Sequence, residues 1–329
     1  MLKLTDIHQT FHAGEVNEVR ALRGVDLHLT AGQFVTVIGS NGAGKSTLFN
    51  VIAGVYPPSQ GQVQIDGVAV TAWPEHRRAA LIGRVFQDPL LGTAASMTIA
   101  QNLTLALLRG RRLGWRTGVT KARQDDFQAL LEPLGLGLEK RLTTRVALLS
   151  GGQRQALTLV MATLARPKIV LLDEHIAALD PATAAKILQL TQAFIANQGL
   201  TALMITHNMQ QALHVGDRTL MMDRGRIVLD LTGAERQQMT VQALIERFGQ
   251  VRHNQLLEDE LLLQVSAGSL VGFDRLNPCW LSLSKPTFKN PIFKRGEKDA
   301  QIKIDCPALA LWVLGAIPAD RLCCTSGPG

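Results

Sequence analysis

The residues that carry the clearest chemistry form a glycine-rich segment near the N-terminus, which matches the pattern G-x-x-x-x-G-K-[ST]. It reads Gly39-Ser40-Asn41-Gly42-Ala43-Gly44-Lys45-Ser46-Thr47. Glycines at this spacing let backbone N–H groups turn toward phosphate oxygens, and the positive end of a following helix adds to the attraction. We therefore expect Lys45 to place a cation on the β- and γ-phosphates of a nucleotide. Ser46 is expected to ligate Mg²⁺, and Thr47 to contact the α-phosphate.

Two adjacent carboxylates, Asp173 and Glu174, follow a continuous apolar segment at residues 169–172. A buried strand would deliver both to its C-terminal end, where open α/β sheets bind their ligands. Neighbouring residues of a strand point to opposite sides, so the two carboxylates can take separate roles. We expect Asp173 to hold Mg²⁺ through water and Glu174 to polarise an attacking water. Acidic residues at the end of a strand are common, so this pair indicates a nucleotide site only in combination with the glycine-rich segment.

A second anion-binding pattern, Ser150-Gly151-Gly152-Gln153, lies about 105 residues after Lys45 and opens a predicted helix. Ser150 suits the N-cap of that helix, and the two glycines expose backbone N–H groups to an anion. Two phosphate-binding devices serve little purpose if one chain works alone. They make sense if each chain lends its Ser150 loop to the nucleotide that is held by another chain.

Composition sets wide limits on these interpretations. The chain has 329 residues, of which 46% are hydrophobic and 19% charged, so it is neither largely disordered nor a small disulfide-stapled protein. The formal net charge of +7 suits an anionic ligand or surface but does not by itself indicate nucleic acid, and an ordinary basic protein is the alternative. No run reaches the ~18 apolar residues of a membrane span, and the first residues do not resemble a signal peptide, so we expect a cytosolic location.

Strands and helices that would position the motifs alternate over residues 1 to about 250. Uninterrupted apolar strands joined by helices predict a parallel sheet covered on both faces. These strands are expected at residues 33–38, 169–172 and 201–205. Short strands at residues 2–7, 25–29 and 63–65 predict an antiparallel edge sheet, and residues 221–228 predict a hairpin that turns at Gly225.

Two regions depart from this alternation. Residues of about 90–150 are rich in Leu, Ala and Arg, with helical spacing at 101–108 and 123–131, and they predict a helical subdomain inserted into the α/β body. Residues 264–329 hold six of the thirteen prolines and continue no strand–helix pattern. We expect residues 251–263 to end the main domain and 264–329 to be a poorly ordered, atypical extension.

With these motifs in this order, residues 1 to about 263 resemble the ATP-binding subunit of an ABC transporter. The resemblance implies an α/β fold of the P-loop NTPase class, in which a RecA-like parallel sheet carries an antiparallel β subdomain and the inserted helical subdomain. It implies ATP as the substrate and Mg²⁺ as the cofactor. It also implies that residues 39–47 of one chain and Ser150, Gly151, Gly152 and Gln153 of another enclose each ATP.

The resemblance implies roles for four further residues. Phe11 would stack on adenine, although a phenylalanine in the core or at a strand edge would look the same. Gln87 would touch Mg²⁺ and the lytic water and link to the membrane subunit, where the alternative is a solvated loop glutamine. His207 would contact the γ-phosphate. Asp180 would lie in a loop that crosses a dimer interface, and with Pro181 it also reads as a helix start.

The implied partners are a second ATP-binding subunit, expected to be another copy of this chain, membrane permease subunits and, indirectly, a periplasmic or lipoprotein solute-binding protein. No nucleic acid is expected, and the location would be the cytoplasmic face of the inner membrane. Residues 17–24, 84–89 and 173–181 resemble a bacterial subgroup of import-type subunits for small solutes such as amino acids. Where Ala177 stands, the family usually has serine. The arginine-rich residues 109–116 fit either a contact with lipid headgroups or a membrane subunit, or a solvated loop.

Two other functional classes share the ATPase chemistry. A soluble ABC ATPase that acts on ribosomes usually carries two cassettes in a chain, and one that repairs DNA has a long coiled coil between Lys45 and Ser150. This sequence has one cassette and no such heptad run. An export-type subunit is often fused to membrane spans. The sequence therefore favours the importer over both alternatives.

Overall fold

The computed structural model describes residues 1–110 and 118–250. The expectations for residues 251–263 and 264–329, and for most of the arginine-rich segment 109–116, lie outside the described residues. A first compact unit begins at Met1 and reaches Ile245, and a second begins at Glu246. All the helices and strands named below belong to the first unit. Within residues 1–110 and 118–250, no helix combines the length and the apolar character that spanning a membrane requires.

A six-stranded sheet forms the centre of the first unit, in the order β10-β9-β3-β8-β7-β6. Its strands are β3 (Phe34–Gly39), β6 (Ile82–Val85), β7 (Ile169–Asp173), β8 (Thr201–Ile205), β9 (Arg218–Asp223) and β10 (Arg226–Thr232). All neighbours pair in parallel except β10, which forms an antiparallel hairpin with β9. The apolar side chains of β3, β7 and β8 are buried on both faces of the sheet. The predicted parallel sheet and hairpin are confirmed.

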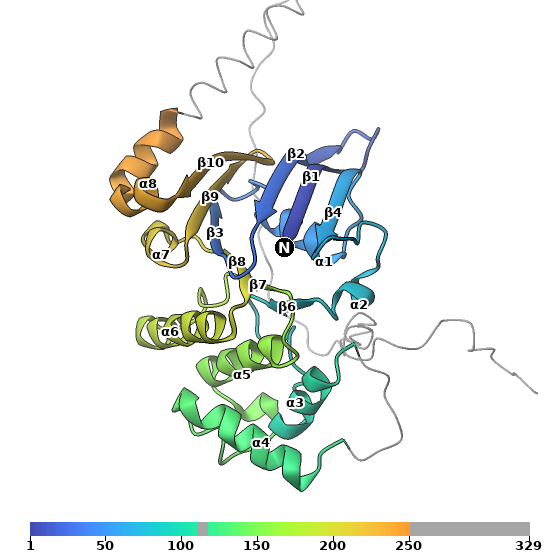
Figure 1. Cartoon of the computed structure of the whole chain (residues 1–329), viewed down its shortest axis with the longest axis vertical. Helices are drawn as coiled ribbons and strands as arrows, with labels where there is room; N and C mark the ends of the chain where they lie inside the picture. Colours follow the sequence, from blue (N-terminus) through green and yellow to red (C-terminus); the bar gives the residue numbers. More distant parts are fainter. Residues whose placement is uncertain (111–117, 251–329) are drawn as a thin grey trace, which may run out of the picture. The chain divides into compact units, whose positions relative to one another are not determined.

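A second, antiparallel sheet has the order β2-β1-β4-β5 (Figure 1). Its strands are β1 (Leu2–Phe11), β2 (Val19–Leu29), β4 (Gln60–Ile65) and β5 (Val68–Ala69). The prediction of this sheet is confirmed, but β1 and β2 are longer than the sequence suggested. Shifts in the β1–β2 register after Leu4, Ile7 and Gln9 interrupt the two-residue alternation of buried and exposed side chains, which hides the strands' full length in the sequence.

Helix α1 (Lys45–Ala53) joins the two sheets, because one apolar cluster includes residues of α1 and of both sheets. Its C-terminal end is held by Arg78, whose guanidinium is fully buried. Arg78 donates hydrogen bonds to the carbonyls of Val51 at 2.7 Å and Ile52 at 2.9 Å. The carbonyl of Val51 also accepts a hydrogen bond of 3.3 Å from the N–H of the C-cap residue Gly54, so Arg78 adds to the backbone bonds that close the helix end. Arg78 therefore fixes the C-terminal end of the helix that begins at Lys45.

The remaining helices belong to the inserted region and to the connections of the parallel sheet. They are α2 (Glu75–Arg78), α3 (Ile99–Leu107), α4 (Lys121–Leu131), α5 (Gly151–Leu164), α6 (Pro181–Gln198), α7 (Met209–His214) and α8 (Gly233–Gln238), with short 3₁₀ turns at Glu132–Leu134 and Val146–Leu148. Helices α3, α4 and α5 lie together (Figure 1) and share an apolar cluster with α6. This cluster is separate from the one around α1, so the inserted helices have a core of their own.

Candidate functional site

The parallel sheet brings most of the predicted residues to one edge. Strands β3, β8, β7 and β6 are consecutive and parallel, so their C-terminal ends lie side by side. The glycine-rich loop follows β3, His207 follows β8, and Asp173 and Glu174 end or follow β7. Gln87 lies two residues beyond the end of β6 at the same edge and is exposed. Four motifs that are far apart in the sequence thus meet at one edge.

Lys45 is the most enclosed charged residue of the glycine-rich loop, with 6% of its surface exposed. Its Nζ donates to the carbonyl oxygens of Gly39 at 2.8 Å and Ser40 at 2.9 Å. An ammonium group has three N–H donors, so one remains for a phosphate oxygen. Burial lowers the pKa of Lys45, while the neighbouring carboxylates of Glu174 and Asp173 act in the opposite direction. The loop is therefore organised around a cation before any phosphate arrives.

The glycines of the loop allow close packing against two strands. Gly39 has φ 152° and Gly44 has φ 98°, a backbone region that side chains disfavour. A Cβ at Gly39 would lie 2.2 Å from the carbonyl oxygen of Met222 in β9, and one at Gly44 would lie 2.6 Å from that of Ala21 in β2. A larger residue at either position would push the loop away from the sheets.

Ser40 has a partner that sequence reasoning missed. Its hydroxyl donates to Oδ1 of Asp223 at 3.1 Å, and Asp223 is buried at the end of β9. The signal in the sequence was an acidic residue at the end of another apolar strand, in the same position relative to the sheet as Asp173. Asp223 therefore ties the loop to the strand on its far side.

Glu174 and His207 face each other across neighbouring strand ends. Oε1 of Glu174 lies 2.6 Å from Nε2 of His207, and 12% of the Glu174 side chain is exposed against 48% of His207. Glu174 has φ 45°, a left-handed conformation that is strained for a residue with a side chain. The pair joins an enclosed carboxylate to an imidazole that is open to solvent. This arrangement suits a group that orients water beside a group that reaches an incoming ligand.

Asp173 lies against Arg84 of β6, at 3.6 Å between Oδ2 and Nη2. Burial raises the pKa of Asp173, whereas Arg84 acts to lower it. The guanidinium of Arg84 also lies over the ring of Phe86, 4.6 Å from its centroid. Arg84 belongs to the segment 84–89 that carries part of the family resemblance, but the sequence does not predict its contact with Asp173. The carboxylate of Asp173, the hydroxyl of Ser46 and the amide oxygen of Gln87 are hard oxygen donors of the kind that Mg²⁺ prefers, and a buried carboxylate fits a nearby cation.

Phe11 ends β1 and is partly buried. Its ring packs edge-to-face on Tyr56, with 5.3 Å between the centroids and an interplanar angle of 82°. Tyr56 is the single tyrosine of the sequence and was not singled out. This geometry fits both alternatives for Phe11, a surface for adenine and a strand-edge contact.

The Ser150 loop forms the start of α5, as predicted. The hydroxyl of Ser150 accepts a hydrogen bond from the backbone N–H of Gln153, and the side-chain oxygen of Gln153 accepts one from the N–H of Ser150, both at 3.2 Å. A Cβ at Gly152 would lie 2.4 Å from Cγ2 of Thr183 in α6, but one at Gly151 would meet nothing closer than 3.6 Å. Packing therefore explains Gly152, whereas Gly151 is exposed and has room for a Cβ, in ordinary contact with Leu179.

Asp180 is the N-cap of α6, and Pro181 is its first residue, as predicted. Oδ1 of Asp180 accepts a hydrogen bond of 3.0 Å from the backbone N–H of Thr183. This bond lowers the pKa of the exposed carboxyl group. Asp180 thus caps α6 within the single chain.

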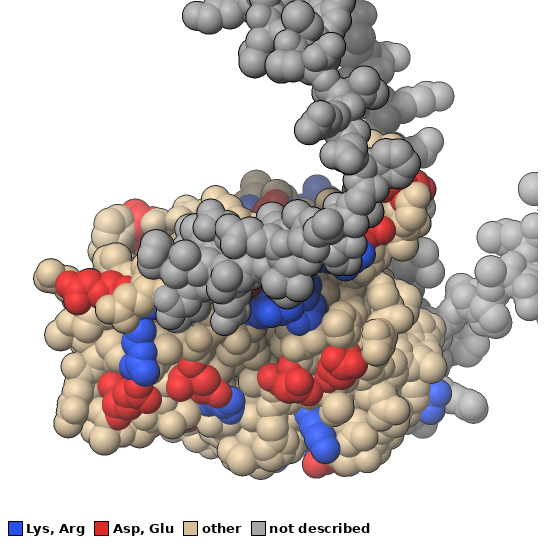
Figure 2. Space-filling view, turned by 90° about the horizontal axis from the view of Figure 1, so that it is seen from above, with Lys and Arg blue, Asp and Glu red and all other residues tan. Residues whose placement is uncertain are grey.

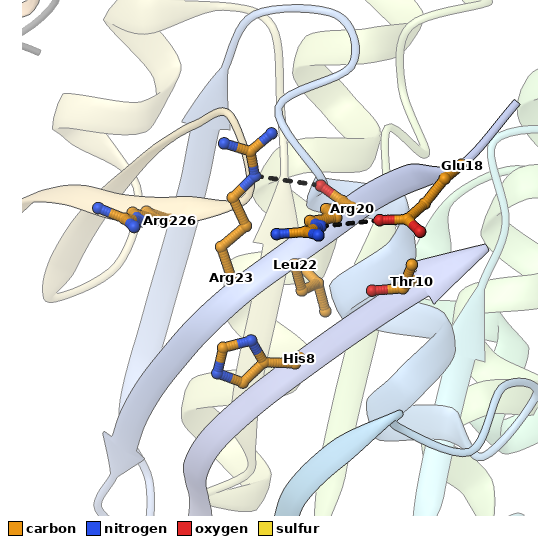
Figure 3. A pocket seen from close by; sticks show the side chains of 7 residues that line it. All are labelled: His8, Thr10, Glu18, Arg20, Leu22, Arg23 and Arg226. Carbon is orange, nitrogen blue, oxygen red and sulfur yellow. Dashed lines mark hydrogen bonds and ion pairs between the residues drawn. The ribbon is translucent and has the colours of Figure 1, made fainter. Parts of the chain in front are cut away.

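A separate cavity of about 540 Å³ opens on the antiparallel sheet and the β9–β10 hairpin (Figure 3). It is lined by His8, Thr10, Glu18, Arg20, Leu22, Arg23 and Arg226. Oε1 of Glu18 accepts a hydrogen bond of 2.8 Å from Nε of Arg20. None of the predicted ligands of ATP or Mg²⁺ belongs to this lining, although Glu18, Arg20, Leu22 and Arg23 come from the segment 17–24 that carries part of the family resemblance.

Comparisons with known proteins agree with the geometry of the strand edge. A family profile described as "ABC transporter" matches residues 22–177. A tyrosine transport ATP-binding protein of Clostridioides difficile is 42% identical over 250 residues, which are 75% of this chain and 98% of that protein. The methionine import ATP-binding protein MetN of Thermobifida fusca is 38% identical over 232 residues, 69% of this chain and 68% of that protein.

Solved structures give the same result. A dimeric ATP-binding cassette bound to ADP and phosphate has a TM-score of 0.61 and 29% identity, and the match covers 70% of this chain and 98% of that one. The ADP conformation of another ABC transporter cassette has a TM-score of 0.62 and 26% identity, with 75% and 98% covered. The chain therefore belongs to the ATP-binding cassettes of ABC transporters, a family of P-loop ATPases, and it is the ATP-hydrolysing subunit of a solute-import system.

Proposed function

We propose that two copies of this chain close around two molecules of Mg-ATP, each held between Lys45 of one copy and Ser150 of the other. The observation that carries this proposal is the exposed start of α5 at Ser150 and Gly151, where the hydroxyl of Ser150 accepts a hydrogen bond from the N–H of Gln153 alone. Such a helix end attracts phosphate. The similarity to a dimeric cassette adds support.

Within each site, catalysis consists of positioning and charge neutralisation, as in other phosphoryl transfers. Lys45 binds the β- and γ-phosphates, and Ser46, Asp173 and Gln87 hold Mg²⁺, which neutralises phosphate charge when bound. Glu174 aligns the attacking water, and His207 steadies the γ-phosphate. The contact of 2.6 Å between Glu174 and His207 supports their joint assignment.

The hydrolytic assignment is tested with Glu174→Gln. The amide keeps the size of the side chain but cannot accept a proton from water, so we expect ATP binding to persist while turnover falls by roughly a thousandfold. The variant should accumulate as an ATP-bound dimer, which gel filtration with and without ATP will reveal. Hydrolysis by Glu174→Gln at the wild-type rate would refute the role of Glu174.

A membrane permease is the proposed partner at the Gln87 side of the cassette. Leu90 and Leu91, just beyond Gln87, are 42% and 52% exposed, and these two adjacent apolar side chains suit a docking contact. The proposed location is accordingly the cytoplasmic face of the membrane. Mild-detergent purification of the tagged chain from native membranes should recover a multi-span protein, and Leu91→Asp should lose it while its ATP affinity is unchanged. Recovery of the chain with ribosomes alone would refute a permease as its partner.

Nucleic acid is not a proposed partner. On the face shown in Figure 2, lysine and arginine side chains alternate with aspartate and glutamate, and the visible described surface carries no broad field of positive charge. Binding of a labelled DNA or RNA duplex at moderate salt should therefore be weak and non-specific.

The proposed solute is an amino acid, and the first candidate is one with an aromatic side chain. The relative named for tyrosine transport, which this chain covers over 98% of its length, supports this class. A cassette does not itself touch the solute, so the test requires the transport system. Cells that lack this chain should lose uptake of labelled tyrosine and regain it with the wild-type gene but not with Glu174→Gln. Normal tyrosine uptake in the deleted strain would exclude this solute.

A further inference from the structure

His175 follows Glu174 directly and is almost fully enclosed, with 2% of its surface exposed. Its Nε2 lies 3.0 Å from the hydroxyl oxygen of Thr191 in α6. That hydroxyl donates its single hydrogen to the carbonyl of Ile187 at 2.8 Å, so toward His175 it can act only as an acceptor. The imidazole must therefore carry its hydrogen on Nε2 and donate it to Thr191.

The other ring nitrogen of His175, Nδ1, is buried and has no hydrogen-bond partner among the described residues. Burial lowers the pKa of His175 to about 4, so the ring is neutral at physiological pH. A buried acceptor without a partner costs free energy, and an apolar side chain of similar size would avoid that cost. Packing alone therefore does not explain a histidine at this position.

The neighbouring Glu174 needs support, because its backbone has the strained φ of 45°. Its N–H donates to the carbonyl of Ile205 at 3.2 Å, and its carbonyl accepts from the N–H of Ala177 at 2.9 Å. These bonds fix the N–H of Glu174 and close a turn over residues 174–177, and the side chain that follows Glu174 in this turn is buried in the fold. That side chain is His175, which is anchored to α6.

We propose that His175 is a positioning residue for ATP hydrolysis: through its hydrogen bond to Thr191 it holds Glu174 in the conformation that directs the carboxylate to His207. The inference rests on the proposed role of Glu174. It also makes α6 part of the hydrolytic apparatus, because Thr191 lies within α6, the helix that Asp180 caps.

Thr191→Val tests the hydrogen bond, since valine keeps the shape of threonine and removes the acceptor. We expect kcat to fall about tenfold while the KM for ATP stays within about twofold, because the loss concerns alignment of the water and not nucleotide binding. Thr191→Ser keeps the hydroxyl and should retain most of the wild-type kcat. His175→Gln, whose amide can still donate near the Nε2 position, should retain more activity than His175→Leu.

A matched control separates positioning from loss of stability. Thr163 is buried in α5 and its hydroxyl donates within its own helix, to the carbonyls of Leu159 and Val160. Thr163→Val should lower the melting temperature in a similar way but leave kcat near that of the wild type. If Thr191→Val and Thr163→Val lose the same fraction of kcat, the proposal is wrong.

The same substitution in the Glu174→Gln background distinguishes the two possible failures. If His175 acts through Glu174, Thr191→Val should not slow the residual single-turnover hydrolysis of Glu174→Gln any further. An equal fold loss in both backgrounds would overturn the positioning role while leaving that of Glu174 intact. Wild-type turnover in Glu174→Gln alone would instead refute the proposed role of Glu174.

Discussion

The two loops of this chain that we propose to bind phosphate are built in different ways. The loop at Lys45 is enclosed: its lysine donates to two carbonyls of its own loop, and Gly39 and Gly44 pack directly on β9 and β2. The loop at Ser150 is exposed, and its side chains are used to begin α5. The first loop is a finished half-site within one chain. The second is a surface that becomes a site only when a phosphate is brought to it.

Removing the cation of the enclosed loop should have the largest effect. Lys45→Ala deletes a buried ammonium with charge-assisted bonds, and we expect the affinity for ATP to fall roughly 10- to 100-fold. Isothermal calorimetry measures this directly. Lys168→Ala is the control, since Lys168 is an exposed lysine paired with Asp66. Unchanged affinity in Lys45→Ala would contradict the assignment of the enclosed loop.

The exposed loop is tested with Gly151→Asp. A Cβ fits at this position, and an acidic residue in the first turn suits the helix dipole, so the single chain should remain as stable as the wild type. The new carboxylate should repel the phosphates of the other chain and abolish ATP-dependent dimerisation, while ATP binding to the single chain persists. A variant that dimerises with ATP would show that the loop at Ser150 does not face a phosphate.

Mixing the two variants sharpens the comparison further. A dimer of Lys45→Ala with Gly151→Asp contains one site with an intact lysine and an intact Ser150 loop, because these come from different chains. Hydrolysis in the mixture, but in neither variant alone, is therefore expected. If the two loops served the same nucleotide within one chain, the mixture would stay inactive.

A smaller effect is expected at Phe11. Stacking of a base on an aromatic ring contributes about 1–3 kcal/mol, so Phe11→Ala should raise the Kd for ATP roughly tenfold. Inorganic triphosphate, which has no base, should bind both proteins equally. An equal loss for both ligands would indicate that Phe11 supports the strand edge and does not contact adenine.

The smallest effect concerns the N-cap of α6. Hydrogen bonds in the folded chain lower the pKa of Asp180, so its charge stabilises the fold above the ordinary aspartate pKa, and this contribution is lost as the pH falls through the lowered value. Asp180→Asn keeps a good cap without the charge. In urea unfolding, its stability should lie slightly below wild type at pH 7 and converge with it once the pH falls below the lowered pKa of Asp180. A difference that is independent of pH would exclude a role of the charge.

The sequence predicts best where the local pattern and the tertiary structure agree. The apolar strands at β3, β7 and β8 appear within about one residue of their predicted ends, because a strand buried on both faces is apolar throughout. The caps at Ser150 and Asp180 were predictable from residue type alone. The full lengths of β1 and β2 were not, because register shifts break the alternation.

Side-chain contacts between residues far apart in the sequence could not be predicted from the sequence. Arg84 beside Asp173, Asp223 beside Ser40 and Thr191 beside His175 each join residues at least 16 positions apart. Each pair depends on which strands and helices become neighbours. The individual residues were visible in the sequence, but their partners follow only from the sheet order.

Arg78, the buried guanidinium at the C-terminal end of α1, has a consequence for how ATP binding and folding are linked. The dipole of α1 has its negative end at Arg78 and its positive end at the loop that we propose to bind phosphate. The protein supplies the countercharge at one end permanently, and the nucleotide supplies it at the other. When ATP is bound, α1 thus has a countercharge at both ends. Because ATP binds the folded chain, its binding also stabilises the fold.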